Sequence, residues 1–192
     1  KGDVEAAINS YKKAASVNPD YAEAHKNMGH ALKAKGDLQA AIKSYKQAIQ
    51  INPDYDEAYN NMGNALECQG DTEADIESYK QAIKLNPDFS PAYNNMGSSL
   101  EMTGALELAA NAFKMAIKIN PEFIEARFNL GNVLNKQNDI AGALTSYKSV
   151  VDKQPQHAEC HNNMGLVYRK KGDTKAAIES LVRALCIEPE NK

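Results

Sequence analysis

The sequence lacks tryptophan, any close pair of cysteines and any long apolar run. Its three cysteines, Cys68, Cys160 and Cys186, are scattered and odd in number, which argues against a disulfide framework and favours a reducing, cytoplasmic compartment. No stretch approaches the roughly 18 apolar residues of a membrane span. The chain opens directly into a periodic helical segment without a signal-peptide pattern, so we expect a cytoplasmic protein without a membrane partner.

Neither sign of charge dominates, because 22 basic and 25 acidic residues leave a net charge of −3. Nucleic-acid partners usually require a basic excess, so none is expected here. The sequence also has no G-x-S-x-G, no P-loop and no dinucleotide-binding glycine cluster. His157 and His161 have a spacing that suits a metal on a helix, but no fourth ligand accompanies them and Cys160. We therefore predict a protein that is not an enzyme and that holds neither cofactor nor metal.

What the sequence does contain is a 34-residue period, which three separate series of residues follow. The prolines of the first series are Pro19, Pro53, Pro87, Pro121, Pro155 and Pro189. The second series consists of Gly29, Gly63, Gly97, Gly131 and Gly165. The third consists of Gly2, Gly36, Gly70, Gly104, Asn138 and Gly172. A fixed period of this length predicts a stacked array in which each unit buries its apolar face on its neighbours.

Each period contains the signals of two helices. Asp20, with Glu23 three residues later, makes a capping-box pattern that predicts the start of the first helix. Gly36 ends this helix and Asp37 caps the next one, which stops before Pro53 because the residue preceding a proline avoids the α region. Apolar residues recur on one face of each helix. The period is therefore an antiparallel helical hairpin.

Gly29 lies inside the first helix, where glycine costs up to about 1 kcal/mol relative to alanine. We expect this glycine to allow close approach of the second helix, whose Ala41 and Ala48 present small surfaces. Asp75 stands where other units have alanine, and Val150 replaces the second alanine once. Since a buried carboxylate costs several kcal/mol unless it is paired, we expect Asp75 to be hydrogen-bonded or displaced towards water.

The unit resembles the tetratricopeptide repeat, whose signature is a small-residue contact within a helical hairpin that a proline closes. The resemblance covers essentially the whole chain and implies an all-α, right-handed α-solenoid of antiparallel helix hairpins. We predict eleven helices and no strand. Residues 1–21 form the second helix of a partial repeat, and the complete repeats are 22–55, 56–89, 90–123, 124–157 and 158–191.

The resemblance implies that first helices line a concave groove, which makes their outward positions candidates for peptide binding. One column is the same in every repeat: Asn27, Asn61, Asn95, Asn129 and Asn163. The column one residue earlier reads Lys26, Asn60, Asn94, Phe128 and Asn162. The column three residues later reads His30, Asn64, Ser98, Asn132 and Leu166. Basic residues follow towards the end of the groove: Lys136, Arg169 and Lys170.

Asparagine is a mediocre helix former, so its repetition on one helical face requires a reason. Its amide offers donors and an acceptor that match a peptide group. Helical layers lie about 8–10 Å apart and an extended chain advances about 3.3 Å per residue, so one asparagine per repeat would contact about every third ligand residue. The column is similar to the asparagine ladder in the superhelical arm of O-linked N-acetylglucosamine transferase, which holds substrate peptide backbone. The alternative is that these amides bond to neighbouring helices and fix the superhelix.

Three functions remain open at this point. The first is a protein-interaction scaffold that binds an extended peptide in its groove, with the amides of Asn61, Asn95 and Asn129 free of internal partners. The second is the substrate-recognition arm of a larger enzyme such as a glycosyltransferase. The third is a structural array that self-associates through its ends, where Ile8 and Leu185 are expected to lack covering helices.

Overall fold

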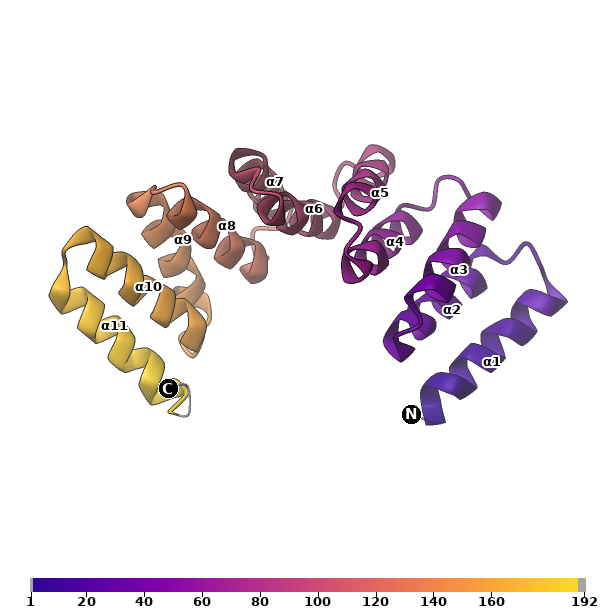
Figure 1. Cartoon of the computed structure of the whole chain (residues 1–192), viewed down its shortest axis with the longest axis horizontal. Coiled ribbons are helices and arrows are strands. Elements are labelled where there is room, and N and C mark those ends of the chain that lie inside the picture. Colours follow the sequence, from indigo (N-terminus) through magenta and orange to yellow (C-terminus); the bar gives the residue numbers. More distant parts are fainter. Residues whose placement is uncertain (1, 190–192) are drawn as a thin grey trace. The chain divides into compact units, whose positions relative to one another are not determined.

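The computed structural model describes residues 2–189, and these form eleven α-helices without a strand, as the sequence predicts (Figure 1). The helices are α1 (Gly2–Val17), α2 (Ala22–Lys35), α3 (Leu38–Ile51), α4 (Asp56–Gln69), α5 (Thr72–Leu85), α6 (Ser90–Met102), α7 (Leu106–Ile119), α8 (Ile124–Lys136), α9 (Ile140–Lys153), α10 (Ala158–Lys171) and α11 (Thr174–Ile187). None of these described helices is long and apolar enough to cross a membrane. The predicted end of the fifth repeat at residue 191 lies outside the described residues.

The turns inside the hairpins follow the predicted glycine and aspartate chemistry. Gly36 ends α2 in the left-handed conformation with φ 91°, and the Asp37 side chain accepts a hydrogen bond from the backbone of α3. Asn138 takes the same left-handed role with φ 65°, which explains the single substitution in that glycine series. The prediction for Asp20 is wrong, because Tyr21 occupies the N-cap of α2 and its side chain makes no capping bond.

Glycines in the first helices permit a tyrosine of the second helix to approach closely. A Cβ atom added to Gly29 would lie 2.6 Å from the Tyr45 ring, and one added to Gly131 would lie 2.5 Å from the Tyr147 ring. Both tyrosine side chains are completely buried. The predicted close approach is therefore confirmed, but the group that lies over Gly29 and Gly131 is a tyrosine ring and not one of the expected alanines.

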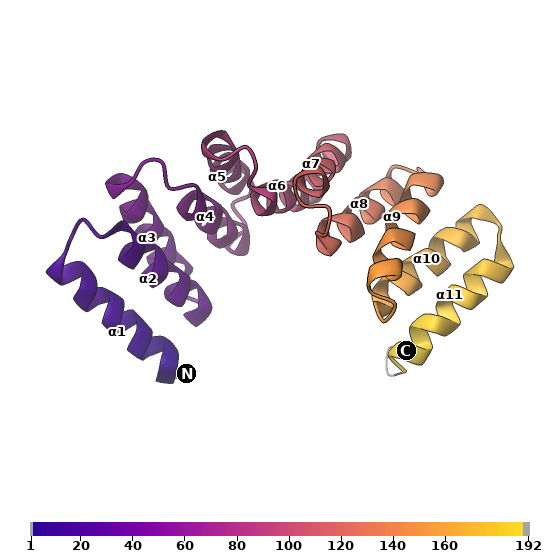
Figure 2. The same ribbon diagram turned by 180° about the vertical axis from the view of Figure 1, so that it is seen from behind.

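The chain divides into two compact units, residues 1–99 and residues 100–192, with the boundary inside α6. Within the first unit α2 contacts α4, whereas α3 and α5 make no contact among the described residues. Within the second unit α8 contacts α10, whereas α9 and α11 make none in the described part of the chain. First helices therefore converge on one side of each unit, which we call the inner face (Figures 1 and 2).

The first helix is more deeply buried than the sequence predicts, whereas the last helix is as exposed as predicted. Ile8 of α1 is only 1% exposed because α1 packs on α2, so the expectation that it lacks cover is wrong. On α11, by contrast, Val182 and Leu185 are about half exposed, as predicted.

Candidate peptide-binding face

The asparagine columns lie where neighbouring first helices meet, and several of their amides bond to one another. The Asn95 amide donates to Oδ1 of Asn60 at 3.0 Å and to Oδ1 of Asn64 at 2.9 Å. In the second unit the Asn163 amide donates to Asn132 Oδ1 at 3.1 Å. The prediction of free amides is therefore wrong for Asn95, because the close approach of first helices brings adjacent repeats within hydrogen-bond distance.

A tyrosine of the second helix shares the same acceptor oxygens. Tyr79 Oη donates to Asn64 Oδ1 at 2.8 Å, so this oxygen accepts from its own hairpin and from the following first helix. Tyr147 Oη donates to Asn132 Oδ1 at 2.7 Å in the same way. Because a carbonyl oxygen has two lone pairs, each of these asparagines satisfies two donors at once. The resulting bridge joins two consecutive repeats.

These bonds determine which amide groups on the inner face remain available to a ligand. Both amide hydrogens of Asn95 are donated internally, so its Oδ1 is the group left for the N–H of a ligand. Asn94 and Asn129 also have interaction partners. Asn27 and Asn61 are half-buried and make no side-chain hydrogen bond within the part of the chain that the structure describes. Asn162 is exposed.

The first complete repeat lacks the bridging asparagine. His30 occupies the position of Asn64 and Asn132, and its side chain is exposed. Tyr45, the counterpart of Tyr79, is completely buried, and its hydroxyl has no hydrogen-bond partner. Burial raises the pKa of Tyr45 to about 12, although nearby Lys26 acts in the opposite direction.

Lys26, the basic member of the columns, already has an anionic partner. Its Nζ lies 2.6 Å from Glu57 Oε2 and 5.2 Å above the centre of the Tyr55 ring. Burial acts to lower the pKa of Lys26, but hydrogen bonds to Glu57 and Tyr55 outweigh it and the pKa is raised. Lys26 therefore remains charged, with its ammonium group directed at α4 and the turn before it.

The three basic residues predicted at the end of the groove do come together. Lys136, Arg169 and Lys170 line a hollow of about 510 Å³ with Asn135 and Leu166. Lys136 is paired with Glu101 at 2.8 Å, and Lys170 Nζ lies 3.5 Å from the backbone oxygen of Asn135. Arg169 makes no ion pair among the described residues, so it supplies positive charge to this surface.

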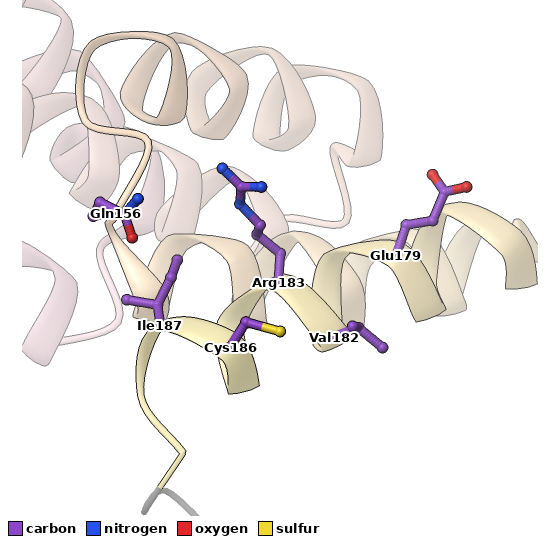
Figure 3. Close-up of a pocket in the computed structure, with 6 residues that line it drawn as sticks. All are labelled: Gln156, Glu179, Val182, Arg183, Cys186 and Ile187. Atoms are coloured by element: carbon purple, nitrogen blue, oxygen red, sulfur yellow. The ribbon is translucent and has the colours of Figure 1, made fainter.

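A second surface of interest lies on α11. Val182, Arg183, Cys186 and Ile187 line a hollow of about 430 Å³ there, and Figure 3 shows Val182 pointing away from the neighbouring helices. The same 34-residue position is lysine in the four preceding repeats. The apolar character of this surface is therefore particular to α11.

Asp75 meets neither of the two outcomes that the sequence predicts. The side chain is completely buried, yet neither carboxylate oxygen has a hydrogen-bond partner. The buried Ser99 hydroxyl also has no hydrogen-bond partner. Its proximity to Asp75 acts to lower the pKa of the carboxylate. Burial dominates and raises the pKa of Asp75 to about 6.

Comparison with known proteins identifies the class. A model described as "TPR repeat" matches residues 1–36, 29–70 and 131–172, and models described as "Tetratricopeptide repeat" match residues 56–89, 78–110 and 158–191. The chain belongs to the tetratricopeptide repeat family. A comparison with curated protein sequences found no match.

Solved structures agree with this fold. The crystal structure of YrrB, described as a TPR protein with an unusual peptide-binding site, is 23% identical, with a TM-score of 0.80 over 96% of this chain and 95% of that one. The crystal structure of MamA is 26% identical, with a TM-score of 0.80 over 85% of this chain and 95% of that one. PilF of Pseudomonas aeruginosa is 19% identical, with a TM-score of 0.86 over 99% of this chain and 86% of that one.

Sequence reasoning missed the role of the tyrosines in this site. Tyr45, Tyr79 and Tyr147 share one position of the second helix, where an aromatic ring alone indicates packing and no role for the hydroxyl group. The signal was present, however, because an asparagine precedes Tyr79 and Tyr147 by 15 residues and a histidine precedes Tyr45 by the same interval.

Proposed function

We propose that this chain is a protein-interaction scaffold that binds an extended peptide along the inner faces of its repeats. The fold is that of tetratricopeptide scaffolds, which supports a protein or peptide as the partner. The observation that carries the proposal is the column of one asparagine in every first helix, on the face where first helices converge.

The internal hydrogen bonds determine whether each asparagine of the column offers a donor, an acceptor or both to the peptide. Asn95 donates within the array, so it contributes an acceptor for a backbone N–H, whereas Asn27 and Asn61 retain both donor and acceptor groups. Contact with backbone groups gives affinity without selecting side chains. Selectivity then comes from charge, where the hollow around Arg169 and Lys170 favours an acidic ligand residue and Leu166 adds an apolar contact.

The test uses a fluorescein-labelled peptide selected from a random library on the immobilised chain. The double variant Asn27→Ala/Asn61→Ala loses ligand contacts but no described internal hydrogen bond. At about 0.5–1.5 kcal/mol for each bond, binding should weaken about tenfold while the melting temperature stays unchanged. Fluorescence polarisation and thermal unfolding measure the two effects.

The matched control is Asn95→Ala/Asn163→Ala, which removes described internal bonds and should therefore lower the melting temperature. Unchanged affinity in the Asn27→Ala/Asn61→Ala variant, for peptides of several sequences, would show that the column is structural and that the peptide binds elsewhere.

A further inference from the structure

The hydrogen-bond bridge between repeats forms at Asn64 and Asn132, and the first complete repeat has the two donors of this bridge without its acceptor. In the repeats containing Asn64 and Asn132, an amide oxygen of the chain accepts from a buried tyrosine hydroxyl and from the next asparagine in the column. The equivalent donors in the first repeat are Tyr45 Oη and Asn61 Nδ2. His30 stands where the acceptor asparagine would be.

The Tyr45 ring lies over Gly29 as the Tyr79 ring lies over Gly63, so the Tyr45 hydroxyl takes the place equivalent to that of Tyr79, and it has no partner. Its side chain is 0% exposed, and an unsatisfied buried donor destabilises the fold until an acceptor is supplied. Asn61 makes no side-chain hydrogen bond within the described residues, and Lys26 lies close enough to influence the tyrosine. By equivalence with Tyr79 and Asn95, these two donors border a place that holds an amide oxygen in the repeats of Asn64 and Asn132.

We propose that this place is a binding subsite for a backbone carbonyl oxygen of the peptide ligand. The oxygen would accept from Tyr45 Oη and Asn61 Nδ2 and would reproduce the two bonds that Asn64 Oδ1 makes with Tyr79 and Asn95. His30, whose side chain is exposed, borders the subsite. The ligand thus completes the bridge and fixes its own register on the array at the first repeat.

This inference rests on the proposed function, and one substitution tests it from within the chain. His30→Asn installs the same amide that the repeats of Asn64 and Asn132 use. It should raise the melting temperature, because Tyr45 gains a partner, and it should weaken binding of the library-selected peptide about tenfold, because the chain's own oxygen occupies the subsite. Unchanged affinity would overturn the proposal.

Tyrosine variants provide the matched comparison. Tyr45→Phe removes a hydroxyl that has no internal partner, so it should weaken peptide binding without lowering the melting temperature. Tyr79→Phe and Tyr147→Phe remove hydroxyls bonded at 2.8 Å and 2.7 Å, so they should lower the melting temperature and leave the subsite intact. A Tyr45→Phe protein as destabilised as Tyr79→Phe would show that the Tyr45 hydroxyl is already satisfied, which contradicts the subsite.

A second probe separates this subsite from the proposed function as a whole. Acetyl-triglycine amide offers backbone groups alone, and at high concentration it should shift the side-chain amide signals of Asn61 in NMR spectra of the wild type but not of His30→Asn. If the library yields no binding peptide, the proposed function fails, and these shifts alone decide the subsite. Equal shifts in both proteins, or none in the wild type, would overturn it.

Discussion

At the scale of single residues, Asp75 is the most costly departure from the repeat pattern. Alanine occupies its position in four other repeats, at 41, 109, 143 and 177, and is buried in each. The Asp75 carboxylate is equally buried, without a hydrogen-bond partner for either oxygen. Removal of a charge from water without compensation is unfavourable, which is why its pKa rises to about 6 from the usual 3.8.

The raised pKa of Asp75 predicts a pH dependence of stability. The folded state holds this proton more tightly than the unfolded state, so the contribution of Asp75 to stability is greatest below about pH 3.8 and is lost as pH rises through about 6. Asp75→Ala should therefore stabilise the protein more at pH 7 than at pH 4, by up to about 3 kcal/mol. Chemical denaturation at the two pH values measures the difference.

Glu73→Ala, which removes an exposed carboxylate from the same helix, serves as the control for this prediction. A stabilisation by Asp75→Ala that is equal at both pH values would mean that the carboxylate is not the titrating group. Loss of stability would mean that the Asp75 carboxylate makes a contact that supports the fold.

At the scale of helices, the features that depend on neighbouring residues in the chain could be predicted from the sequence. The turns at Gly36 and Asn138, and the close approach at Gly29, follow from backbone conformation and side-chain size, which the sequence states directly. The partners of Asn95 could not be predicted in this way. Whether its amide reaches the preceding repeat depends on the spacing and rotation between stacked hairpins, and a difference of about 1 Å decides between a hydrogen bond and none.

The bridge at Asn132 yields a prediction for this scale. Asn132→Ala would leave the Tyr147 hydroxyl and the Asn163 amide without their shared acceptor. Because a buried unsatisfied donor costs about 1–3 kcal/mol, the free energy of unfolding should fall by about that amount. Urea denaturation measures it, and Asn162→Ala, at an exposed position on α10, should change stability little. Equal effects of both substitutions would show that the bridge contributes nothing to stability.

At the scale of the whole molecule, α11 presents an exposed apolar surface of a kind that the repeats of a stacked array normally bury on one another. On α11 the residues Ile178, Val182 and Leu185 are 56%, 51% and 50% exposed, whereas Leu144, the equivalent of Ile178 in the preceding repeat, is 6% exposed. Val182 adds to this surface at a position that is lysine in the other repeats.

We predict that a second copy of this chain covers the exposed surface of α11. Two α11 helices related by a twofold axis would bury Val182 against its counterpart and bring Glu179 of each copy towards Arg183 of the other, which makes the surface self-complementary in charge. Sedimentation velocity should then show dimers whose fraction rises with concentration. Val182→Lys, which restores the residue of the other repeats, should shift the population to monomer while the melting temperature at low concentration stays unchanged. Lys148→Ala, at the equivalent exposed position of α9, is the control and should leave dimerisation as it is; a wild-type chain that remains monomeric at high concentration would contradict the prediction.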